Sequence, residues 1–448
     1  MALESRPNTP NAVLDLIEDG ADLIVPLANG EPVSVLDAIE AEAKRFRGVT
    51  VHQMHALHDR PYLHGTMRDH LFHVSYFLSP VTRPAFHARG CDLVPNHFSE
   101  VPRLLRETTK CSLVLAAASP MDRHGYFSLG TNCDYAAPFI GHVPFFLEVN
   151  AQMPRTFGRN QLHLSQVAGW TEVDRPLVEV APPEPNDADR AIAGFVAERV
   201  PNGATLQAGI GCIPNALLAG LRDHRDLGVH TELLSDALID LVETGVVTGT
   251  RKKVTPGKVV TTFALGTRRL YDFLHENPAI ELLPVDYVND PRVIAIEECF
   301  VSINATTEVD LVGQCASETV AGRYWSSSGG QADFARGAMY SERGLAFVVL
   351  RSTAHTAEGE VSRIRATLTP GSMVTTLKNT VDHIVTEFGV ADMRGRSIAQ
   401  RARALIAIAH PRFRDPLAVE ARSLGYLWPS VSVLAPGSGM VTSTTPSP

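Results

Sequence analysis

Short apolar runs recur along the chain, separated by stretches in which apolar residues fall three or four positions apart. The first pattern is typical of buried strands, and the second is typical of helices with one buried face. Their alternation predicts mainly parallel sheets covered by helices on both faces. The predicted strands are residues 21–27, 49–53, 92–95, 112–118, 143–147, 205–209, 227–231, 259–263, 281–285, 301–304, 347–350, 373–376 and 383–386. The predicted helices include residues 35–46, 101–106, 215–224, 237–244 and 396–409.

A proline-rich segment interrupts the alternation near the middle of the chain. Residues 181–186 hold three prolines within four positions, which favours a stiff, extended linker. We therefore expect an N-terminal domain at residues 1–182 and a C-terminal domain at residues 186–434. Residues 435–448 are rich in glycine, serine, threonine and proline and are expected to form a flexible tail.

Composition narrows the class of protein. The 448 residues are 44% hydrophobic and 20% charged, as expected for a globular chain with a large core. A net charge of −9 argues against a nucleic-acid-binding surface. The six cysteines form no CxxC pair, no basic and apolar leader opens the chain, and no apolar run is long enough to span a membrane. These features predict a cytoplasmic enzyme with reduced thiols.

A glycine turn in residues 207–215 is the first candidate site. Gly209 and Gly211 allow close backbone approach, and Pro214 suits the first turn of the helix that follows. Such a turn directs free N–H groups toward a ligand. The residues alone leave anion binding and a merely tight turn equally open. The turn also resembles half of a dinucleotide fingerprint; it lacks the third glycine, but the spacing to Glu232 keeps that alternative open.

Glu232 follows the predicted strand 227–231, so its carboxylate is expected at the carboxyl edge of the sheet, where open α/β folds bind ligands. Ser235 or Asp236 is expected to cap the next helix. A lone glutamate at a strand end is usually solvated or paired with a cation. Its position between the turn at residues 207–215 and a second small-residue loop at residues 326–334 favours a functional role. The second loop fits an oxyanion site, with a flexible hairpin as the alternative.

Six histidines lie close together in the first part of the chain. They carry no paired cysteine or carboxylate motif, so scattered core and surface histidines are favoured over a metal site. No metal is expected. The histidines are His52, His55, His58, His64, His70 and His73.

Several runs of residues resemble one enzyme family across almost the whole chain. The chain is similar to the acetyl-CoA hydrolase/transferase group of family I CoA-transferases, near the 4-hydroxybutyrate, butyrate and acetate CoA-transferases. The matching runs are residues 98–105, 122–130, 148–156, 209–216, 230–236, 284–291, 308–314, 329–334 and 386–395.

The resemblance implies two open α/β domains of the CoA-transferase (NagB/RpiA-like) type, with the active site between them. It implies Glu232 as the catalytic residue and a homodimer or homotetramer without a permanently bound cofactor. Acyl-CoA and a short-chain carboxylic acid are the implied substrates, and no nucleic acid or membrane partner is expected. The implied CoA-binding residues are Gly209, Ile210, Gly211, Cys212, Ile213, Ser327, Gly329 and Gly330, and those of the substrate pocket are Asn289, Gln152 and Met153.

Two positions depart from the family pattern. Ser327 stands where the family usually has a glycine, and Ala237 stands where a glycine commonly follows Ser-Asp. Ser327 is expected to change acyl specificity. The expected reaction is ping-pong transfer through a glutamyl-CoA thioester, which requires Glu232 to be ionised, as its usual pKa allows unless burial raises it. An acyl-CoA hydrolase using the same glutamate, or a catalytically impaired acyl-CoA-binding homologue, is the alternative.

Overall fold

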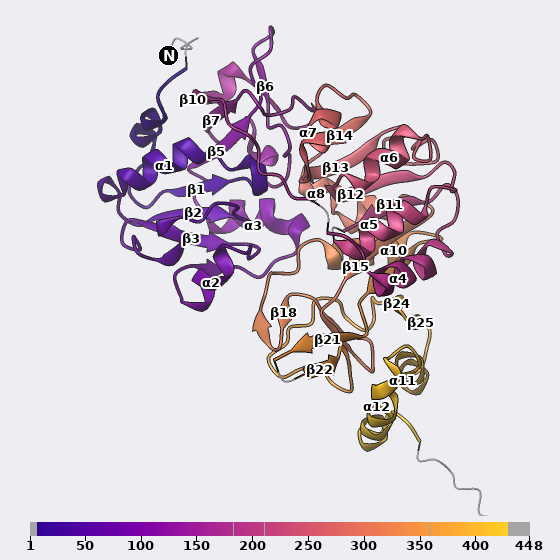
Figure 1. The fold of residues 1–448 in the computed structure, drawn as a ribbon. Coiled ribbons are helices and arrows are strands. Elements are labelled where there is room, and N and C mark those ends of the chain that lie inside the picture. The colour runs from indigo at the N-terminus through magenta and orange to yellow at the C-terminus, as the bar shows by residue number, and fades with distance from the viewer. Residues whose placement is uncertain (1–6, 182, 210, 358, 429–448) are drawn as a thin grey trace, which may run out of the picture.

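Two α/β lobes lie side by side, and a smaller part of the chain extends below the second lobe (Figure 1). The computed structural model describes residues 7–181, 183–209, 211–357 and 359–428. We call the part that carries the first large sheet, up to residue 173, the first lobe. Residues 187–428 are the second lobe, and we count the smaller part that extends below it as belonging to this lobe. The predicted tail at residues 435–448 lies outside the described residues.

The first lobe is built on a seven-stranded sheet whose strand pairs are all parallel. The interior strand β5 is an unbroken apolar run that is fully buried, as expected for a strand covered on both faces. In sheet order the strands are β10 (Val167–Val173), β7 (Phe145–Asn150), β5 (Leu113–Ala118), β1 (Asp22–Val25), β2 (Val49–Gln53), β3 (Leu71–Ser75) and β4 (Asp92–Leu93). The helices are α1 (Val33–Ala41), α2 (Thr82–His87) and α3 (Val101–Thr108), and β6 (Tyr126–Ser128) pairs with β9 (Gln161–His163).

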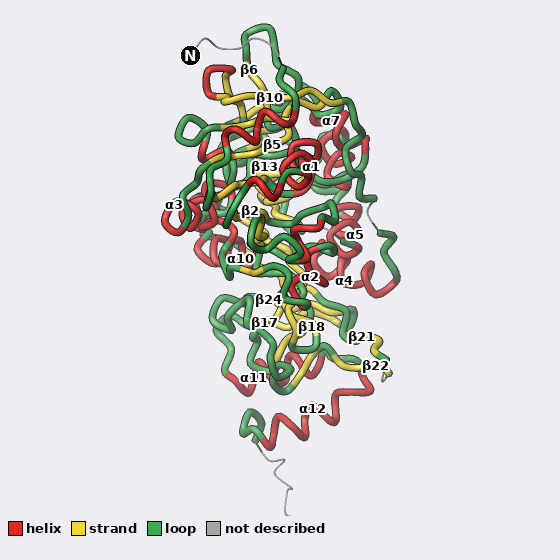
Figure 2. The backbone as a smooth tube through the Cα atoms, turned by 90° about the vertical axis from the view of Figure 1, so that its left-hand side faces the viewer, coloured by secondary structure: helices red, strands yellow, loops and turns green. Residues whose placement is uncertain are grey.

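The second lobe is built on a nine-stranded sheet in which every strand pair is parallel except that of β24 with the edge strand β25. Helices lie on both sides of the strands in the rotated view (Figure 2). In sheet order the strands are β25 (Gly389–Asp392), β24 (His383–Thr386), β20 (Leu345–Val349), β15 (Phe300–Ala305), β11 (Thr205–Ala208), β12 (Gly228–Leu234), β13 (Val259–Ala264), β14 (Ile280–Leu282) and β8 (Phe157–Gly158). The helices are α4 (Asp187–Ala197), α5 (Cys212–Gly220), α6 (Ala237–Glu243), α7 (Arg268–Leu274), α8 (Val285–Val288), α9 (Pro291–Ile294) and α10 (Gln331–Tyr340).

Two further helices near the end of the chain, several short strands in small sheets and seven short 3-10 helices complete the described structure. A side-chain capping box, in which Ser397 and Gln400 bond each other's backbone N–H, starts α11 (Ile398–Ala407), and α12 (Pro411–Ser423) follows it. The small strands are β16 (Glu308–Asp310), β17 (Cys315–Ala316), β18 (Thr319–Val320), β19 (Arg323–Tyr324), β21 (Thr353–Thr356), β22 (Gly359–Ser362) and β23 (Ile364–Arg365). The short 3-10 helices are η1 (Pro10–Leu16), η2 (Ala28–Gly30), η3 (Ala43–Arg45), η4 (Pro61–His64), η5 (Phe98–Glu100), η6 (Ala137–Phe139) and η7 (Leu164–Gln166).

The two lobes share backbone pairing and one hydrophobic core. Strand β8 belongs to the first half of the chain but pairs with β14 at the edge of the second sheet. Beside it, the backbone N–H of Cys133 donates to the Thr262 carbonyl at 2.9 Å, and that of Ala264 donates to the Thr131 carbonyl at 2.8 Å. A single cluster of buried apolar residues runs through both lobes. The lobes are therefore docked tightly enough to hold a site between them.

The predicted fold class is confirmed, and most predicted strands are present. Residues 373–376 are an exception, because they form a loop joined to Cys315 by one isolated bridge rather than a strand. Asp236 precedes α6 but does not cap it, since its carboxylate accepts hydrogen bonds from Thr267 instead. Among the described residues, no helix is both long and apolar enough to cross a bilayer.

Candidate active site

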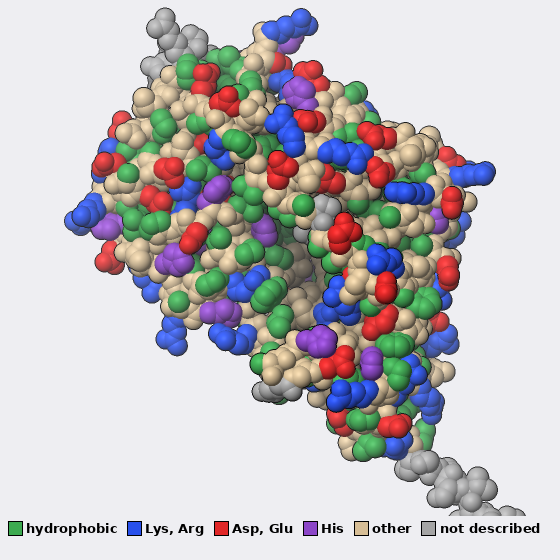
Figure 3. All heavy atoms as spheres, in the orientation of Figure 1, with side chains coloured by type: hydrophobic (Ala, Val, Ile, Leu, Met, Phe, Trp, Pro, Cys, Tyr) green, Lys and Arg blue, Asp and Glu red, His purple; other side chains and the backbone are tan. Residues whose placement is uncertain are grey.

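A cavity of about 190 Å³ lies where the two lobes meet. The space-filling view shows the surface hollowed at this junction (Figure 3). The first lobe contributes Leu27, Met54, His55, Phe77 and Phe98 to the lining. The second lobe contributes Gln207, Ala208, Gly209, Glu232, Leu233, Phe263, Leu265, Asn304, Gly329, Gln331 and Phe334.

Glu232 is the only acidic residue among the described residues that line this cavity. It lies within β12 rather than after it, since the strand continues for two residues to Leu234. Its carboxylate accepts a hydrogen bond from Asn289 Nδ2 at 2.7 Å and another from the backbone N–H of Gly330. Its backbone carbonyl accepts from Thr261 Oγ1 at 3.1 Å, which ties this part of β12 to β13. The carboxylate is therefore held in one orientation, facing the cavity.

The apolar surroundings change the acidity of Glu232. Burial raises the pKa of its carboxyl group to about 7, although the hydrogen bonds from Asn289 and Gly330 act in the opposite direction. A raised pKa at a carboxylate in a cavity is a feature of functional sites. The expectation that the usual low pKa keeps this group ionised is therefore modified, because near neutral pH only part of the population carries the charge.

Gly330 leaves room for the carboxylate. A Cβ atom built on Gly330 would lie 2.0 Å from Glu232 Oε2 and 2.3 Å from Asn289 Nδ2. The φ angle of Gly330 is −95°, which any residue adopts, so the reason for glycine here is space rather than backbone conformation. Its neighbour Gly329 has a φ of +55°, in the left-handed region that favours glycine. Of the loop predicted at residues 326–334, residues 326–330 form a loop that packs against the candidate nucleophile, and residues 331–334 are the start of α10 instead. We call residues 326–330 the glycine loop.

Comparison of the sequence with known protein families identifies the family to which this chain belongs. Residues 4–180 match the acetyl-CoA hydrolase/transferase N-terminal domain, and residues 266–421 match the acetyl-CoA hydrolase/transferase C-terminal domain. The chain belongs to the acetyl-CoA hydrolase/transferase family. The resemblance inferred from the sequence is confirmed.

Similar members of the family are named CoA transferases. A succinyl-CoA:cyclohexane-1-carboxylate CoA transferase from Geobacter metallireducens is 44% identical over 93% of this chain and 95% of its own length. A 4-hydroxybutyrate coenzyme A transferase from Clostridium kluyveri is 40% identical over 91% of this chain and 95% of its own length. The crystal structure of RipA from Yersinia pestis superimposes with a TM-score of 0.89 at 36% identity, over 95% of this chain and 99% of RipA. The expectation of a CoA-transferase enzyme is confirmed.

Among the described residues of the glycine turn that follows β11, Gly209 meets the cavity. Gly209 lines the cavity, and its backbone N–H donates to the Ile303 carbonyl at 3.2 Å, so this N–H is already occupied. Gly211, with a φ of +120°, precedes α5, whose first two residues are Cys212 and Ile213. Pro214 lies in the first turn of α5, as predicted. Ile210 lies outside the described residues.

Among the described residues expected at the site, Gly209, Glu232 and Gly329 line this cavity. Asn289 and Gly330 do not line it but bond the Glu232 carboxylate, and the other six are also absent from the lining: Gly211, Cys212, Ile213, Ser327, Gln152 and Met153. Gln152 is turned toward the surface, where its side chain bonds Asp174 at 2.7 Å and Arg268 at 2.8 Å. Met153 is buried against Gly130. Ser327 is a buried residue of the glycine loop with a φ outside the left-handed region, and it does not line the cavity, so no contact supports the expectation that it sets acyl preference.

The residues that the first lobe contributes were not predicted from the sequence. The sequence marks His55 only as one of several histidines and Phe98 only as the first residue of the matching run 98–105, and Phe77 belongs to no motif. They reach the cavity because the backbone N–H of His55 donates to the Phe77 carbonyl at 3.1 Å, and that of Phe98 donates to the Gly329 carbonyl at 3.2 Å. The second of these bonds joins the first lobe to the glycine loop.

Asp333, just after the glycine loop, provides a second link to the first lobe. It lies in the first turn of α10, and its carboxylate accepts from the Ser99 backbone N–H at 3.1 Å and from Ser99 Oγ at 3.0 Å. Burial, with a smaller effect from the charge of Glu232, raises the pKa of Asp333 to about 8. At neutral pH this carboxyl group is therefore largely protonated, which avoids a second negative charge near Glu232.

The raised pKa of Glu232 predicts the pH dependence of the reaction. Because the nucleophile must be ionised, kcat/KM for acyl-CoA should rise about tenfold per pH unit below about pH 7 and level off above it. In Asn289→Ala the carboxylate loses a donor that lowers its pKa, so the midpoint should move to higher pH. Initial rates measured from about pH 5 to about pH 9 test this. An unchanged midpoint in the variant would contradict it.

Proposed function

We propose that this protein transfers CoA from an acyl-CoA to a carboxylic acid by a ping-pong mechanism in which Glu232 is the nucleophile. The observation that carries the proposal is a single carboxylate held by Asn289 and Gly330 inside an apolar cavity between the two lobes. The names of the similar proteins from Geobacter metallireducens and Clostridium kluyveri support the same reaction type. On this proposal the lobes correspond to domains at residues 1–182 and 186–434.

The reaction begins with attack on the thioester. A carboxylate oxygen of Glu232 adds to the thioester carbonyl, and the carbon–sulfur bond then breaks. CoA leaves as a thiolate, and the acyl group stays on Glu232 as a mixed anhydride. The thiolate then adds to the glutamyl carbonyl, which releases the first carboxylate and forms a glutamyl-CoA thioester. A second carboxylate attacks that thioester, and the same two steps in reverse deliver CoA to the new acid. Each step exchanges one acyl–oxygen bond and one acyl–sulfur bond, so no oxidant or metal is required.

Asn289 and Gly330 have two roles in this sequence. In the resting enzyme their N–H groups orient the Glu232 carboxylate. Once a glutamyl carbonyl is attacked, the same donors lie beside the oxygen on which negative charge develops, as an oxyanion site requires. The apolar lining of the cavity also limits access of water to the glutamyl thioester.

An acyl-CoA hydrolase is the nearest alternative, because water could replace the second acid. The apolar rings around Glu232 disfavour that outcome. A catalytically impaired acyl-CoA-binding homologue is a further alternative. The Glu232 carboxylate lines the cavity and keeps both of its hydrogen bonds, which argues against an impaired homologue.

Trapping the covalent intermediate separates these possibilities. The enzyme is incubated with acetyl-CoA and then with hydroxylamine, and the peptide containing Glu232 is examined by mass spectrometry. A hydroxamate on Glu232 is the expected result, together with acyl-CoA formation when a second acid is supplied. CoA release that does not depend on an added acid would favour the hydrolase, and absence of any adduct would exclude Glu232 as the nucleophile.

A further inference from the structure

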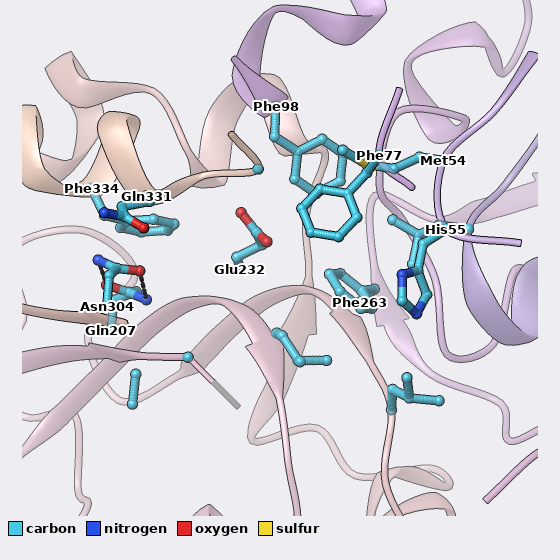
Figure 4. A pocket seen from close by; sticks show the side chains of 16 residues that line it. Met54, His55, Phe77, Phe98, Gln207, Glu232, Phe263, Asn304, Gln331 and Phe334 are labelled. Carbon is cyan, nitrogen blue, oxygen red and sulfur yellow. Dashed lines mark hydrogen bonds between the residues drawn. The ribbon is translucent and has the colours of Figure 1, made fainter. Parts of the chain in front are cut away.

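The cavity has two chemically different ends, with Glu232 between them. In the close-up, the three amide side chains Gln207, Asn304 and Gln331 lie on one side of the carboxylate, together with the ring of Phe334 (Figure 4). Met54, His55, Phe77, Phe98 and Phe263 lie on the other side. We call these the amide end and the aromatic end. An acyl-CoA with its thioester carbon at Glu232 must place its CoA arm toward one end and its acyl group toward the other.

The amide end suits the CoA arm. Gln207 and Asn304 bond each other through their side-chain amides, at 3.2 and 3.1 Å, and Gln331 Nε2 donates to Thr376 Oγ1 at 3.0 Å. These fixed amides leave further polar positions free for a ligand that carries amide groups, as the pantetheine part of CoA does. Gly209, at the turn that leads into α5, also lines the cavity.

The aromatic end offers apolar surface and no cation. Leu27, Met54 and Phe98 are each at most 3% exposed, and Phe77 closes the wall beside Gly329. No lysine or arginine is among the described residues that line the cavity. Of the side chains that the structure describes at this end, His55 is the one that is polar. Burial, together with the positive charge of Arg83, lowers the pKa of His55 to about 4, so the ring is neutral at neutral pH.

Arg83 is the positive charge that acts on His55, and it is already engaged. Its Nε donates to the Trp325 carbonyl at 2.6 Å, and its guanidinium group lies 3.5 Å from the centre of the Trp325 ring. It does not belong to the cavity lining. A ligand carboxylate at the aromatic end would therefore find no free partner charge.

We propose that the aromatic end holds the acyl group and selects an uncharged apolar acid, such as a branched or aromatic monocarboxylic acid, over any acid with a second carboxylate. The inference rests on the proposed function and assigns the substrate class of the same site. A buried carboxylate without a cation loses its hydration without compensation. An apolar acyl group instead gains contacts with Phe77, Phe98 and Met54. His55 is the residue whose neutral ring maintains this selectivity.

Pairs of acids matched in length test the proposal. With acetyl-CoA as donor, kcat/KM is measured for butyrate against succinate, and for isovalerate and benzoate as larger apolar acids. We expect succinate to be poorer than butyrate by on the order of 10²-fold or more, and isovalerate or benzoate to be used at least as well as butyrate. Equal use of succinate and butyrate would overturn the inference and leave the proposed function intact.

A substitution at His55 sharpens the test. His55→Arg places a permanent cation at the aromatic end, so the succinate-to-butyrate ratio of kcat/KM should rise at least about tenfold. His55→Gln changes shape and polarity without adding charge, and it should leave that ratio near the wild-type value even if turnover falls. A ratio that is the same in both variants would overturn the role of His55. If the wild-type enzyme transfers CoA to none of the acids, the proposed function and this inference fail together.

Discussion

Replacing Glu232 with glutamine is expected to reduce CoA transfer by at least about 10⁴-fold, because the amide cannot form the anhydride or the thioester. The side chain keeps its size, and Asn289 Nδ2 can still donate to the amide oxygen, so the cavity should keep its shape. The measurement is single-turnover formation of acetyl-CoA from butyryl-CoA and acetate. Turnover within about tenfold of wild type would contradict the assignment of the nucleophile.

The same variant should be more stable than the wild type at alkaline pH. The pKa of Glu232 is raised in the folded protein from 4.5 to about 7, so between these values the unfolded chain is ionised while the folded protein keeps its proton. Stability from this group is therefore lost as the pH rises from about 4.5 to about 7, and it stays lost above that. Glu232→Gln removes the cost, so its melting temperature should exceed that of wild type at about pH 8 and match it at about pH 4. A difference that does not depend on pH would argue against a buried carboxylate.

Replacing Gly330 with alanine is expected to lower kcat/KM by on the order of 10²- to 10³-fold. The added methyl group would occupy the position of Glu232 Oε2 and displace the carboxylate from Asn289. Because the φ of Gly330 suits alanine, and the group that must move is the end of a side chain, the fold should survive. Rates with saturating acyl-CoA, combined with thermal unfolding, separate loss of catalysis from loss of structure.

Gly194 provides the matched control for Gly330. It is an exposed position within α4, and a Cβ atom built there would meet nothing within 4 Å. Gly194→Ala should leave transfer unchanged and stabilise the protein by roughly 0.5–1 kcal/mol, as alanine does within a helix. If Gly330→Ala behaved like Gly194→Ala, the close approach of the glycine loop to Glu232 would have no catalytic importance.

The sequence was sufficient to predict the fold class and the central carboxylate. The buried parallel strand β5 is a continuous apolar run, which can be identified from the local sequence. Glu232 and the loop at Gly329 and Gly330 were predicted partly from their place after strands and partly from resemblance, and the structure brings them into contact.

The environment of the carboxylate could not be predicted in the same way. The raised pKa of Glu232 depends on burial, and much of that burial comes from Phe77, Phe98 and His55, which lie more than a hundred residues away along the chain. Only the docking of the lobes brings these side chains to β12. Gln152 shows the opposite case, because it lies within the matching run 148–156 but its side chain bonds Asp174 and Arg268 instead of lining the cavity.

The pairing of β8 with β14 has a consequence for how the chain acquires its structure. Residues 157–158 are made before any strand of the sheet that they complete, so they must wait for residues 280–282 to arrive. Severing the chain in the proline-rich linker and producing the second lobe alone would leave β14 as an open edge, and open edges invite association with other chains. The second sheet is thus complete only when a segment from the first half of the chain is present at its edge.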